Sequence, residues 1–222
     1  MIAVIDYGAG NIRSVLNALE ELGEDAVVID APEALRDPAR IILPGVGAMA
    51  PAMARLRERG LDAALTEAVL ERGVPFLGIC LGMQLMCTIG HEGGETVRGL
   101  GWVDGDVVAL EPAPPARLVP HTGWAEVVCD PDDPLFQGLR PGTAFYFCHS
   151  FHARVADPDH CGASIDFGEP VTVGLRCGAA LGVQFHPERS GNAGLRLIEN
   201  FLEWEGPAAA QEQQRRAGAG HG

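Results

Sequence analysis

Apolar residues in the first hundred positions fall into short continuous runs that alternate with helically spaced sets. The runs have the length of buried strands, and they cover residues 1–6, 26–29, 40–43 and 74–79. The helically spaced sets cover residues 12–19, 49–59 and 61–72. Strand, helix and strand in this order predict a parallel sheet with helical crossovers.

Beyond residue 100 the pattern changes to one short strand after another. The predicted strands cover residues 101–110, 124–128, 144–152, 161–167, 171–175 and 180–185. Their short connections indicate that part of this set is antiparallel and extends the parallel sheet. Residues 192–204 return to helical spacing and predict a closing amphipathic helix. The predicted fold class is therefore α/β, with a central, mostly parallel sheet, helices on both faces and additional antiparallel strands in the second half.

Length and composition favour a single domain. The chain has 222 residues, of which 47% are hydrophobic, and this is enough for one large α/β domain with a substantial core. We expect this domain to span residues 1–205. Residues 206–222 are rich in Ala, Gly, Gln and Arg and have no apolar period, so they predict a disordered tail.

The formal net charge of −14 argues against nucleic acid or an anionic membrane as a partner, because both attract basic surfaces. No apolar run reaches the roughly 18 residues that cross a bilayer. The amino-terminal segment becomes acidic at Asp6 and lacks the basic start of a signal peptide. We expect a cytoplasmic protein, and the charge also fits one with a basic partner.

The chain offers no motif for a cofactor or a metal. Gly8 and Gly10 begin a dinucleotide fingerprint, but Arg13 stands where its third glycine belongs. The six cysteines contain no C-x-x-C pair, and we expect them to be reduced. His149 and His152 fall in one predicted strand, at a spacing that points them to opposite faces. We therefore expect neither a cofactor nor a metal site.

Residues 74–88 place Cys80 between a buried strand and the start of a predicted buried helix. Gly78 and Gly82 flank this cysteine, as in the G-x-S-x-G nucleophile elbow with sulfur in place of oxygen. Glycine suits such a turn because a Cβ would clash where the strand and the helix approach each other. The peptide dipoles at the start of the helix would favour a thiolate. The alternative is an ordinary buried cysteine.

A catalytic thiolate needs a base, and the base needs an acid that orients it. His186 and Glu188 are the best candidates, because Pro187 favours extended geometry and positions i and i+2 of an extended segment point the same way. They follow an apolar strand, where α/β sheets place their sites. The alternative is a surface turn. Residues 44–47 (Pro-Gly-Val-Gly) follow another strand and form either half of an oxyanion hole or an ordinary turn.

The motifs at residues 44–47, 78–84 and 184–188, in this order along the chain, resemble the class I (triad) glutamine amidotransferases, and the resemblance covers residues 1–204. It implies the flavodoxin-like fold of that family. Within the family the chain is most similar to the glutaminase subunits of imidazole glycerol phosphate synthase, an enzyme of histidine biosynthesis. The segments that carry this closer resemblance are 7–14, 44–47, 82–84 (Gly-Met-Gln), 119–124 (Val-Pro-His-Thr-Gly-Trp) and 145–150 (Phe-Tyr-Phe-Cys-His-Ser).

The resemblance implies that Cys80 attacks the side-chain amide of glutamine, that His186 moves the protons and that Glu188 holds His186. A γ-glutamyl thioester forms, ammonia leaves, and water then releases glutamate. The backbone N–H groups implied in the oxyanion hole belong to Val46, Gly47 and Leu81. The residues implied in holding the two charged ends of glutamine are Gln84, Glu92, Ser150 and Phe151.

The resemblance also implies a partner, a cyclase subunit with a (β/α)8 barrel that receives the ammonia in a heterodimer. That subunit makes imidazole glycerol phosphate and an aminoimidazole carboxamide ribotide. The residues implied at the interface are Asn11, Arg13, Pro120, His121 and Trp124. The chain departs from the family pattern with Thr122 in place of Met, Ala125 in place of Asn and Arg189 in place of Lys. The alternative place for Trp124 is the core.

Other functions remain open at the level of the sequence. The runner-up is the glutaminase subunit of a different synthase, of the anthranilate or aminodeoxychorismate type. The chain would also serve as a non-catalytic regulatory protein on the same fold, although the intact Cys80, His186 and Glu188 set weighs against this. A thiol hydrolase or peptidase that releases γ-linked glutamate is a further alternative.

Overall fold

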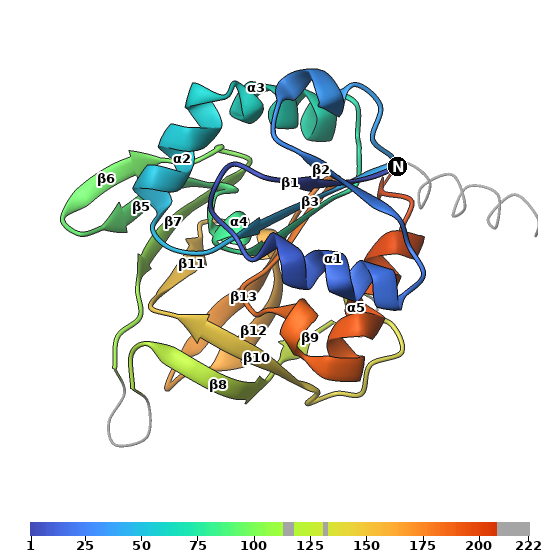
Figure 1. Cartoon of the computed structure of the whole chain (residues 1–222). Helices are drawn as coiled ribbons and strands as arrows, with labels where there is room; N and C mark the ends of the chain where they lie inside the picture. The colour runs from blue at the N-terminus through green and yellow to red at the C-terminus, as the bar shows by residue number, and fades with distance from the viewer. Residues whose placement is uncertain (113–117, 131–132, 208–222) are drawn as a thin grey trace, which may run out of the picture.

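The computed structural model describes residues 1–112, 118–130 and 133–207, so the predicted tail lies outside the described residues from 208 onward. Its main sheet has 12 strands, and most follow the order β2-β1-β3-β4-β14-β13-β11-β7-β5-β6 (Figure 1). Strands β12 and β9 attach beside β13, and β8 and β10 form a second sheet of two strands.

The parallel half of the main sheet uses β1 (Ile2–Ile5), β2 (Ala26–Ile29), β3 (Arg40–Gly45), β4 (Phe76–Cys80) and β14 (Ala180–Val183). The helices are α1 (Ile12–Glu21), α2 (Met49–Glu58), α3 (Leu61–Thr66), α4 (Leu81–Gln84) and α5 (Gly191–Glu203). Each of these strands and helices lies within a few residues of a predicted span, and α4, predicted as the start of a buried helix, is a single turn.

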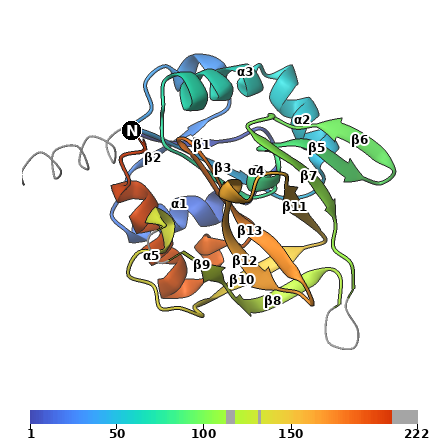
Figure 2. The ribbon, with the colours of Figure 1, turned by 180° about the vertical axis from the view of Figure 1, so that it is seen from behind.

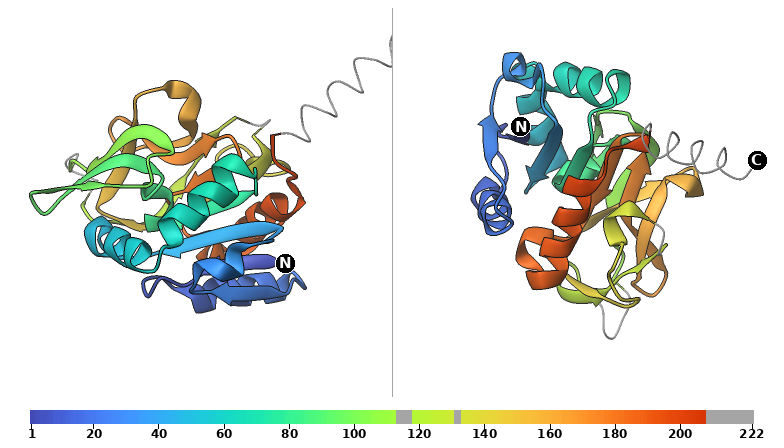
Figure 3. Two further views of the ribbon diagram at one scale, coloured as in Figure 1. Left: turned by 90° about the horizontal axis from the view of Figure 1, so that it is seen from above. Right: turned by 90° about the vertical axis from the view of Figure 1, so that its right-hand side faces the viewer.

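Helices cover both faces of the parallel half. In β1, Ala3 and Ile5 point to the face that packs on α2 and α3, while Ile2 and Val4 point to the face that packs on α1 and α5. Figure 1 shows α2 and α3 on one side of β1 and β3 and α1 and α5 on the other, and Figure 3 shows the same layers from two further directions. Because both faces are covered, these strands form continuous apolar runs.

The second half of the chain supplies the antiparallel strands. They are β7 (Val103–Ala109), β9 (Val128–Cys129), β11 (Phe151–Val155), β12 (Cys161–Asp166) and β13 (Pro170–Cys177). Strand β13 lies antiparallel to β14, and β11, β12 and β7 continue the sheet from there (Figure 2). The predicted α/β class, a mostly parallel centre with antiparallel additions, is confirmed.

The predicted strand at residues 144–152 is two strands that belong to different sheets. Strand β10 (Ala144–His149) pairs with β8 (His121–Glu126), whereas β11 pairs with β7. The chain bends at Ser150 between them. The prediction that His149 and His152 occupy opposite faces of one strand is therefore wrong. The alternating pattern continues through the bend, so it could not reveal the change of sheet.

The hydrophobic pattern did not predict the hairpin of β5 (Cys87–Glu92) and β6 (Glu95–Arg98), which projects from one end of the sheet (Figure 1). Gly93 and Gly94 form its turn with positive φ angles of 61° and 80°. Two residues with φ above zero favour a two-residue hairpin loop, so the Gly-Gly pair was the available signal.

Candidate active site

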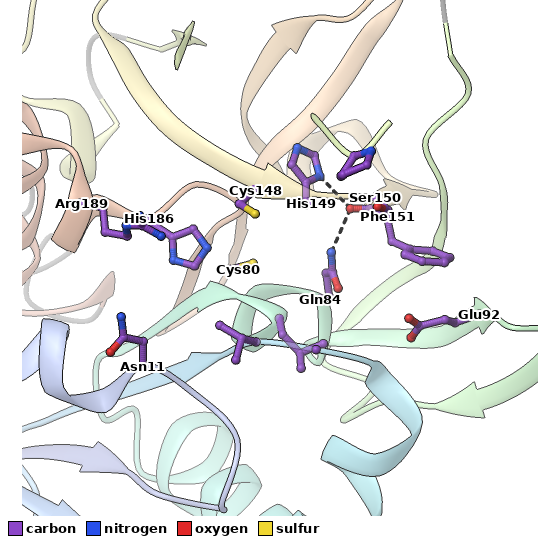
Figure 4. A pocket seen from close by; sticks show the side chains of 14 residues that line it. Asn11, Cys80, Gln84, Glu92, Cys148, His149, Ser150, Phe151, His186 and Arg189 are labelled. Atoms are coloured by element: carbon purple, nitrogen blue, oxygen red, sulfur yellow. Dashed lines mark hydrogen bonds between the residues drawn. The ribbon is translucent and has the colours of Figure 1, made fainter. Parts of the chain in front are cut away.

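The carboxyl ends of the parallel strands meet at one edge of the sheet, and the candidate residues gather there (Figure 4). The ends of β3, β4 and β14, together with the β10–β11 bend, surround a pocket of about 370 Å³. The sequence-predicted residues that line it are Asn11, Val46, Gly47, Cys80, Leu81, Gln84, Glu92, Pro120, Ser150, Phe151 and His186. Ligand sites of open α/β sheets lie at this edge.

Cys80 sits on a strained turn at the end of β4. Its φ of 54° and ψ of −109° make it the one non-glycine residue with positive φ in the described part of the chain. A Cβ at Gly82 would lie 1.8 Å from the Leu43 carbonyl oxygen, and one at Gly78 would lie 2.6 Å from the Gly82 carbonyl oxygen. The close approach that requires glycine at both positions is confirmed. The helix α4 that follows has a single turn, so its dipole adds little support for a thiolate.

His186 and Glu188 form a buried pair beside the sulfur. The Nδ1–H of His186 donates to Oε1 of Glu188 at 2.8 Å, and the two side chains are 8% and 2% exposed. Since Nδ1 is engaged, the other ring nitrogen is the one that bonds Cys80. Burial alone lowers the pKa of His186, but hydrogen bonds and charges from Cys80 and Glu188 outweigh it and raise the pKa to about 10.

The predicted extended geometry from His186 to Glu188 is wrong beyond His186. His186 is extended, with φ of −103° and ψ of 93°, but residues 187–189 then form a turn of 3-10 helix. The carboxylate therefore reaches the imidazole across a turn and not along an extended segment.

Gln84 and Glu92 present hydrogen-bond acceptors to the pocket. The Nε2 of Gln84 donates to the Phe151 carbonyl and to Oε1 of Gln184, both at 2.9 Å, so its two hydrogens are used and its oxygen is left for a ligand. The Oε2 of Glu92 accepts from the backbone N–H of Met49 at 2.9 Å, which leaves Oε1. Two acceptors, one of them charged, suit an ammonium group.

The β10–β11 bend has its carbonyl groups engaged already. The Ser150 carbonyl accepts from the Leu110 N–H at 2.8 Å, and the Phe151 carbonyl accepts from Gln84. What this bend can offer a ligand is therefore N–H or hydroxyl donors, which suit a carboxylate.

His149 also lines the pocket, although no sequence motif pointed to it. It is 6% exposed, and its Nδ1 lies 2.8 Å from the Phe151 carbonyl. Burial lowers the pKa of His149 to about 4, more than the hydrogen bond to Phe151 raises it. The ring is therefore neutral near pH 7. Because a carbonyl only accepts, Nδ1 carries the proton, and Nε2 accepts from Nδ1 of His121 at 3.2 Å.

Two further pocket residues, Cys148 and Arg189, were also missed as site residues. Arg189 lies over the ring of Tyr146, 4.5 Å from its centroid, which is a cation–π contact. The change of sheet at Ser150 brings the end of β10 to the pocket, and no local pattern announces that change.

Two of the five implied interface residues line the pocket, and the other three do not. Asn11 and Pro120 line the pocket, and Arg13 is exposed on the first turn of α1. Trp124 on β8 is 59% exposed, so its alternative place in the core is wrong. His121 is partly buried against His149.

Within residues 1–112, 118–130 and 133–207, no cluster of three or more His, Cys, Asp or Glu side chains is arranged to hold a metal ion. No helix in this part of the chain is long and apolar enough to cross a membrane. All six cysteines are unpaired.

The fold and the Cys–His–Glu arrangement define a class of enzyme, and the chain belongs to the family described as glutamine amidotransferase class-I, whose model matches residues 3–204. Relatives named imidazole glycerol phosphate synthase subunit HisH are similar over nearly the whole chain. The one from Ruegeria pomeroyi is 46% identical over 211 residues and covers 92% of this chain and 99% of that protein. The one from Moorella thermoacetica is 45% identical over 202 residues and covers 91% and 94%.

Solved structures agree on the fold. A structure titled as a glutamine amidotransferase matches with a TM-score of 0.71 and 23% identity, over 91% of this chain and 98% of that one. The structure of PurLQS from Thermotoga maritima matches with a TM-score of 0.71 and 21% identity, over 90% and 96%. Identities this low carry the fold alone.

Proposed function

We propose that the chain is the glutaminase subunit of an imidazole glycerol phosphate synthase and acts in histidine biosynthesis. The observation that carries this is the pocket in which Cys80 on its strained turn meets the buried His186–Glu188 pair, in a chain 46% identical to a subunit of that name. The reaction is hydrolysis of glutamine to glutamate and ammonia.

The geometry suggests how protons move. Because the pKa of His186 is raised to about 10, the imidazole holds its proton near pH 7 beside the sulfur, which then attacks as a thiolate. The attack forms the S–C bond of a tetrahedral intermediate, and His186 gives its proton to the leaving ammonia. In the second half, His186 takes a proton from the water that opens the γ-glutamyl thioester. Glu188 keeps the ring oriented throughout.

The oxyanion would lie next to the backbone N–H groups of Leu81 and of residues 46–47, which line the same pocket as Cys80. The ammonium end of glutamine would lie against Gln84 and Glu92, which present acceptors. Its carboxylate would lie against the donors of the Ser150–Phe151 bend. This assignment gives each charged end of the substrate a matching group.

We also propose a (β/α)8 cyclase subunit as the partner, seated over Asn11, Arg13, Pro120, His121 and Trp124. Two of these residues line the pocket, so a partner seated there would cover its mouth and receive the ammonia directly. The exposed indole of Trp124 fits such a contact because aromatic residues are enriched in interfaces. We propose residues 1–205 as the single domain that does this.

The test is glutamine hydrolysis by the purified chain, alone and then with a cyclase subunit and its ribonucleotide ligand. The proposal expects slow hydrolysis alone and strong stimulation by both together. Cys80→Ala should abolish the reaction, while Cys129→Ala, which changes a cysteine outside the pocket, should not.

The outcomes separate the alternatives. Fast hydrolysis that the cyclase does not stimulate would support the glutaminase activity but contradict a role in histidine biosynthesis, and it would favour a different synthase. Glutamine-dependent activity that survives Cys80→Ala would remove the catalytic assignment. Release of glutamate from γ-linked peptides, with no glutaminase activity in the complex, would identify a peptidase instead.

A further inference from the structure

Gln184 is a fully buried amide that contacts the sulfur of Cys80. It follows β14 directly, its exposed fraction is 0%, and its Nε2 lies 3.6 Å from Sγ of Cys80. It does not line the pocket, so a ligand there would not touch it. Its oxygen accepts from Gln84, whose Nε2 also donates to the Phe151 carbonyl. These contacts form one hydrogen-bond network from the wall of the pocket to the nucleophile.

The donor and acceptor roles in this hydrogen-bond network are fixed at the Phe151 carbonyl. A carbonyl oxygen only accepts, so the atom of Gln84 that faces Phe151 must be the nitrogen. The same nitrogen faces Gln184, so the Gln184 atom there must be the oxygen. That leaves the nitrogen of Gln184 toward Cys80. The sulfur therefore receives an N–H donor, and the amide cannot turn over without placing two donors or two acceptors face to face.

The Phe151 carbonyl, at which this hydrogen-bond network ends, is itself held in place. The Phe151 carbonyl accepts a second hydrogen bond, from Nδ1 of His149, and His149 is held in turn by His121. Figure 4 shows the bonds from Gln84 and His149 converging on the Phe151 carbonyl. With both of its lone pairs engaged, this oxygen has little freedom to turn away from Gln84.

We propose that Gln184 is a positioning residue for the nucleophile: its N–H, oriented by Gln84 and the Phe151 carbonyl, holds the Cys80 sulfur in place and stabilises it as a thiolate. A thiolate is an acceptor without a hydrogen, so an N–H contact favours it and a carbonyl contact would oppose it. His186 supplies the positive charge on one side of the sulfur, and Gln184 supplies a neutral donor on another. Gln184 adds this without titrating and without occupying space in the pocket.

This inference rests on the proposed glutaminase function for its kinetic consequence, but a second readout tests it directly. Alkylation of Cys80 by iodoacetamide, followed by peptide mapping, reports the thiolate whether or not glutamine is the substrate. Cys148 serves as an internal control, because it lines the same pocket and its sulfur accepts from the hydroxyl of Thr122. The experiment measures the alkylation rate of each cysteine across a range of pH.

Three variants test separate parts of this hydrogen-bond network. Gln184→Met removes the donor at similar length and buries no charge. Gln184→Glu keeps the shape and the contact with Gln84 but turns an acceptor toward the sulfur. Gln84→Met leaves Gln184 in place but removes the group that orients it. Thermal unfolding of each variant checks that it has folded.

For Gln184→Met we expect a fall in kcat of roughly 10- to 100-fold, as for loss of a hydrogen bond to a charged group, with KM nearly unchanged. The pH profile of Cys80 alkylation should move to higher pH, and that of Cys148 should stay. Gln184→Glu should move the Cys80 profile further. Gln84→Met should move it less but raise KM, since Gln84 lines the pocket.

The inference fails if the folded Gln184→Met and Gln184→Glu variants alkylate at Cys80 with the wild-type pH profile while the wild-type chain hydrolyses glutamine. It also fails if the loss in Gln184→Met lies entirely in KM. If the wild-type chain does not hydrolyse glutamine even with a cyclase, the proposed function fails, and the alkylation profiles still decide the role of Gln184.

Discussion

Two buried histidines face the same pocket and hold opposite protonation states. The pKa of His186 is raised to about 10, and that of His149 is lowered to about 4, although each residue, backbone included, is 6% exposed. Burial acts in the same direction on both rings and disfavours the charged form. The difference lies in their neighbours. His186 faces Glu188 and Cys80, whereas His149 faces a carbonyl oxygen and the neutral or positive His121.

The two walls of the pocket therefore differ in the groups that they hold. One wall, built from the ends of parallel strands, holds the imidazole of His186 between the Glu188 carboxylate and the Cys80 sulfur. The other, built from the β10–β11 bend, is held by neutral hydrogen bonds that fix the Phe151 carbonyl. An imidazole serves both purposes because its charge follows its surroundings.

The largest expected effect comes from exchanging each histidine for glutamine. His186→Gln should lower kcat for glutamine hydrolysis by roughly 10³-fold or more, since it removes the group that moves protons. His149→Gln should cost less than about 10-fold, because glutamine can still donate one neutral hydrogen bond to Phe151. Steady-state kinetics with the cyclase present measure both. Equal losses would mean that His149 also moves protons.

The lowered pKa of His149 predicts acid sensitivity. In the unfolded chain this ring takes up a proton as the pH falls below about 6.5, whereas the folded ring stays neutral until about 4. The unfolded state binds more protons between these two pH values. The free energy of unfolding therefore decreases as the pH is lowered, by up to about 3 kcal/mol, and the loss levels off below pH 4.

Denaturant unfolding between pH 7 and 4 measures this loss. His149→Gln should flatten the pH dependence by that amount. An unchanged slope in His149→Gln would show that the ring accepts its proton in the folded state at the usual pH.

A smaller loss of activity is expected from changing Glu188, the partner of His186. Glu188→Gln keeps an oxygen near Nδ1 of His186 but removes the negative charge that helps the ring hold its proton. We expect kcat to fall by roughly 10- to 100-fold, less than for His186→Gln, since orientation is only part of what the base needs. If Glu188→Gln were as inactive as Cys80→Ser, the carboxylate would have a larger role than orientation.

The smallest effect on the free chain should come from Trp124. The indole is 59% exposed, so Trp124→Ala should change the free energy of unfolding by less than about 0.5 kcal/mol. Binding of the cyclase should weaken about 5-fold or more, as for an aromatic residue inside an interface. Calorimetry measures both quantities. Unchanged cyclase affinity would place the interface elsewhere.

The sequence by itself determined the parallel half of the fold and singled out Cys80, His186 and Glu188 as the candidate site residues. Short apolar runs and helical spacing are local properties, so they located β1 to β4 and α1 to α3. The elbow around Cys80 and the His186–Glu188 pair are also contiguous motifs, since a strained turn or an i, i+2 pair needs only neighbouring residues. Even the glycines at 78 and 82 follow from the closeness of a strand to the helix after it.

Tertiary structure alone decided the other wall. In the sequence Ser150 falls in the middle of one apolar run, yet the residues before it pair with β8 and the residues after it pair with β7. Both pairing partners are distant in sequence, so local periodicity does not reveal the change. That change brings His149 to the pocket and places Phe151 beside Gln84. The direction of the Gln84–Gln184 bond depends on atoms that face each other across more than sixty residues of sequence. The protonation of His149 depends on its burial and on His121, which lies 28 residues away in sequence. Local periodicity carries no record of either, since it describes neighbours along the chain and not neighbours in space.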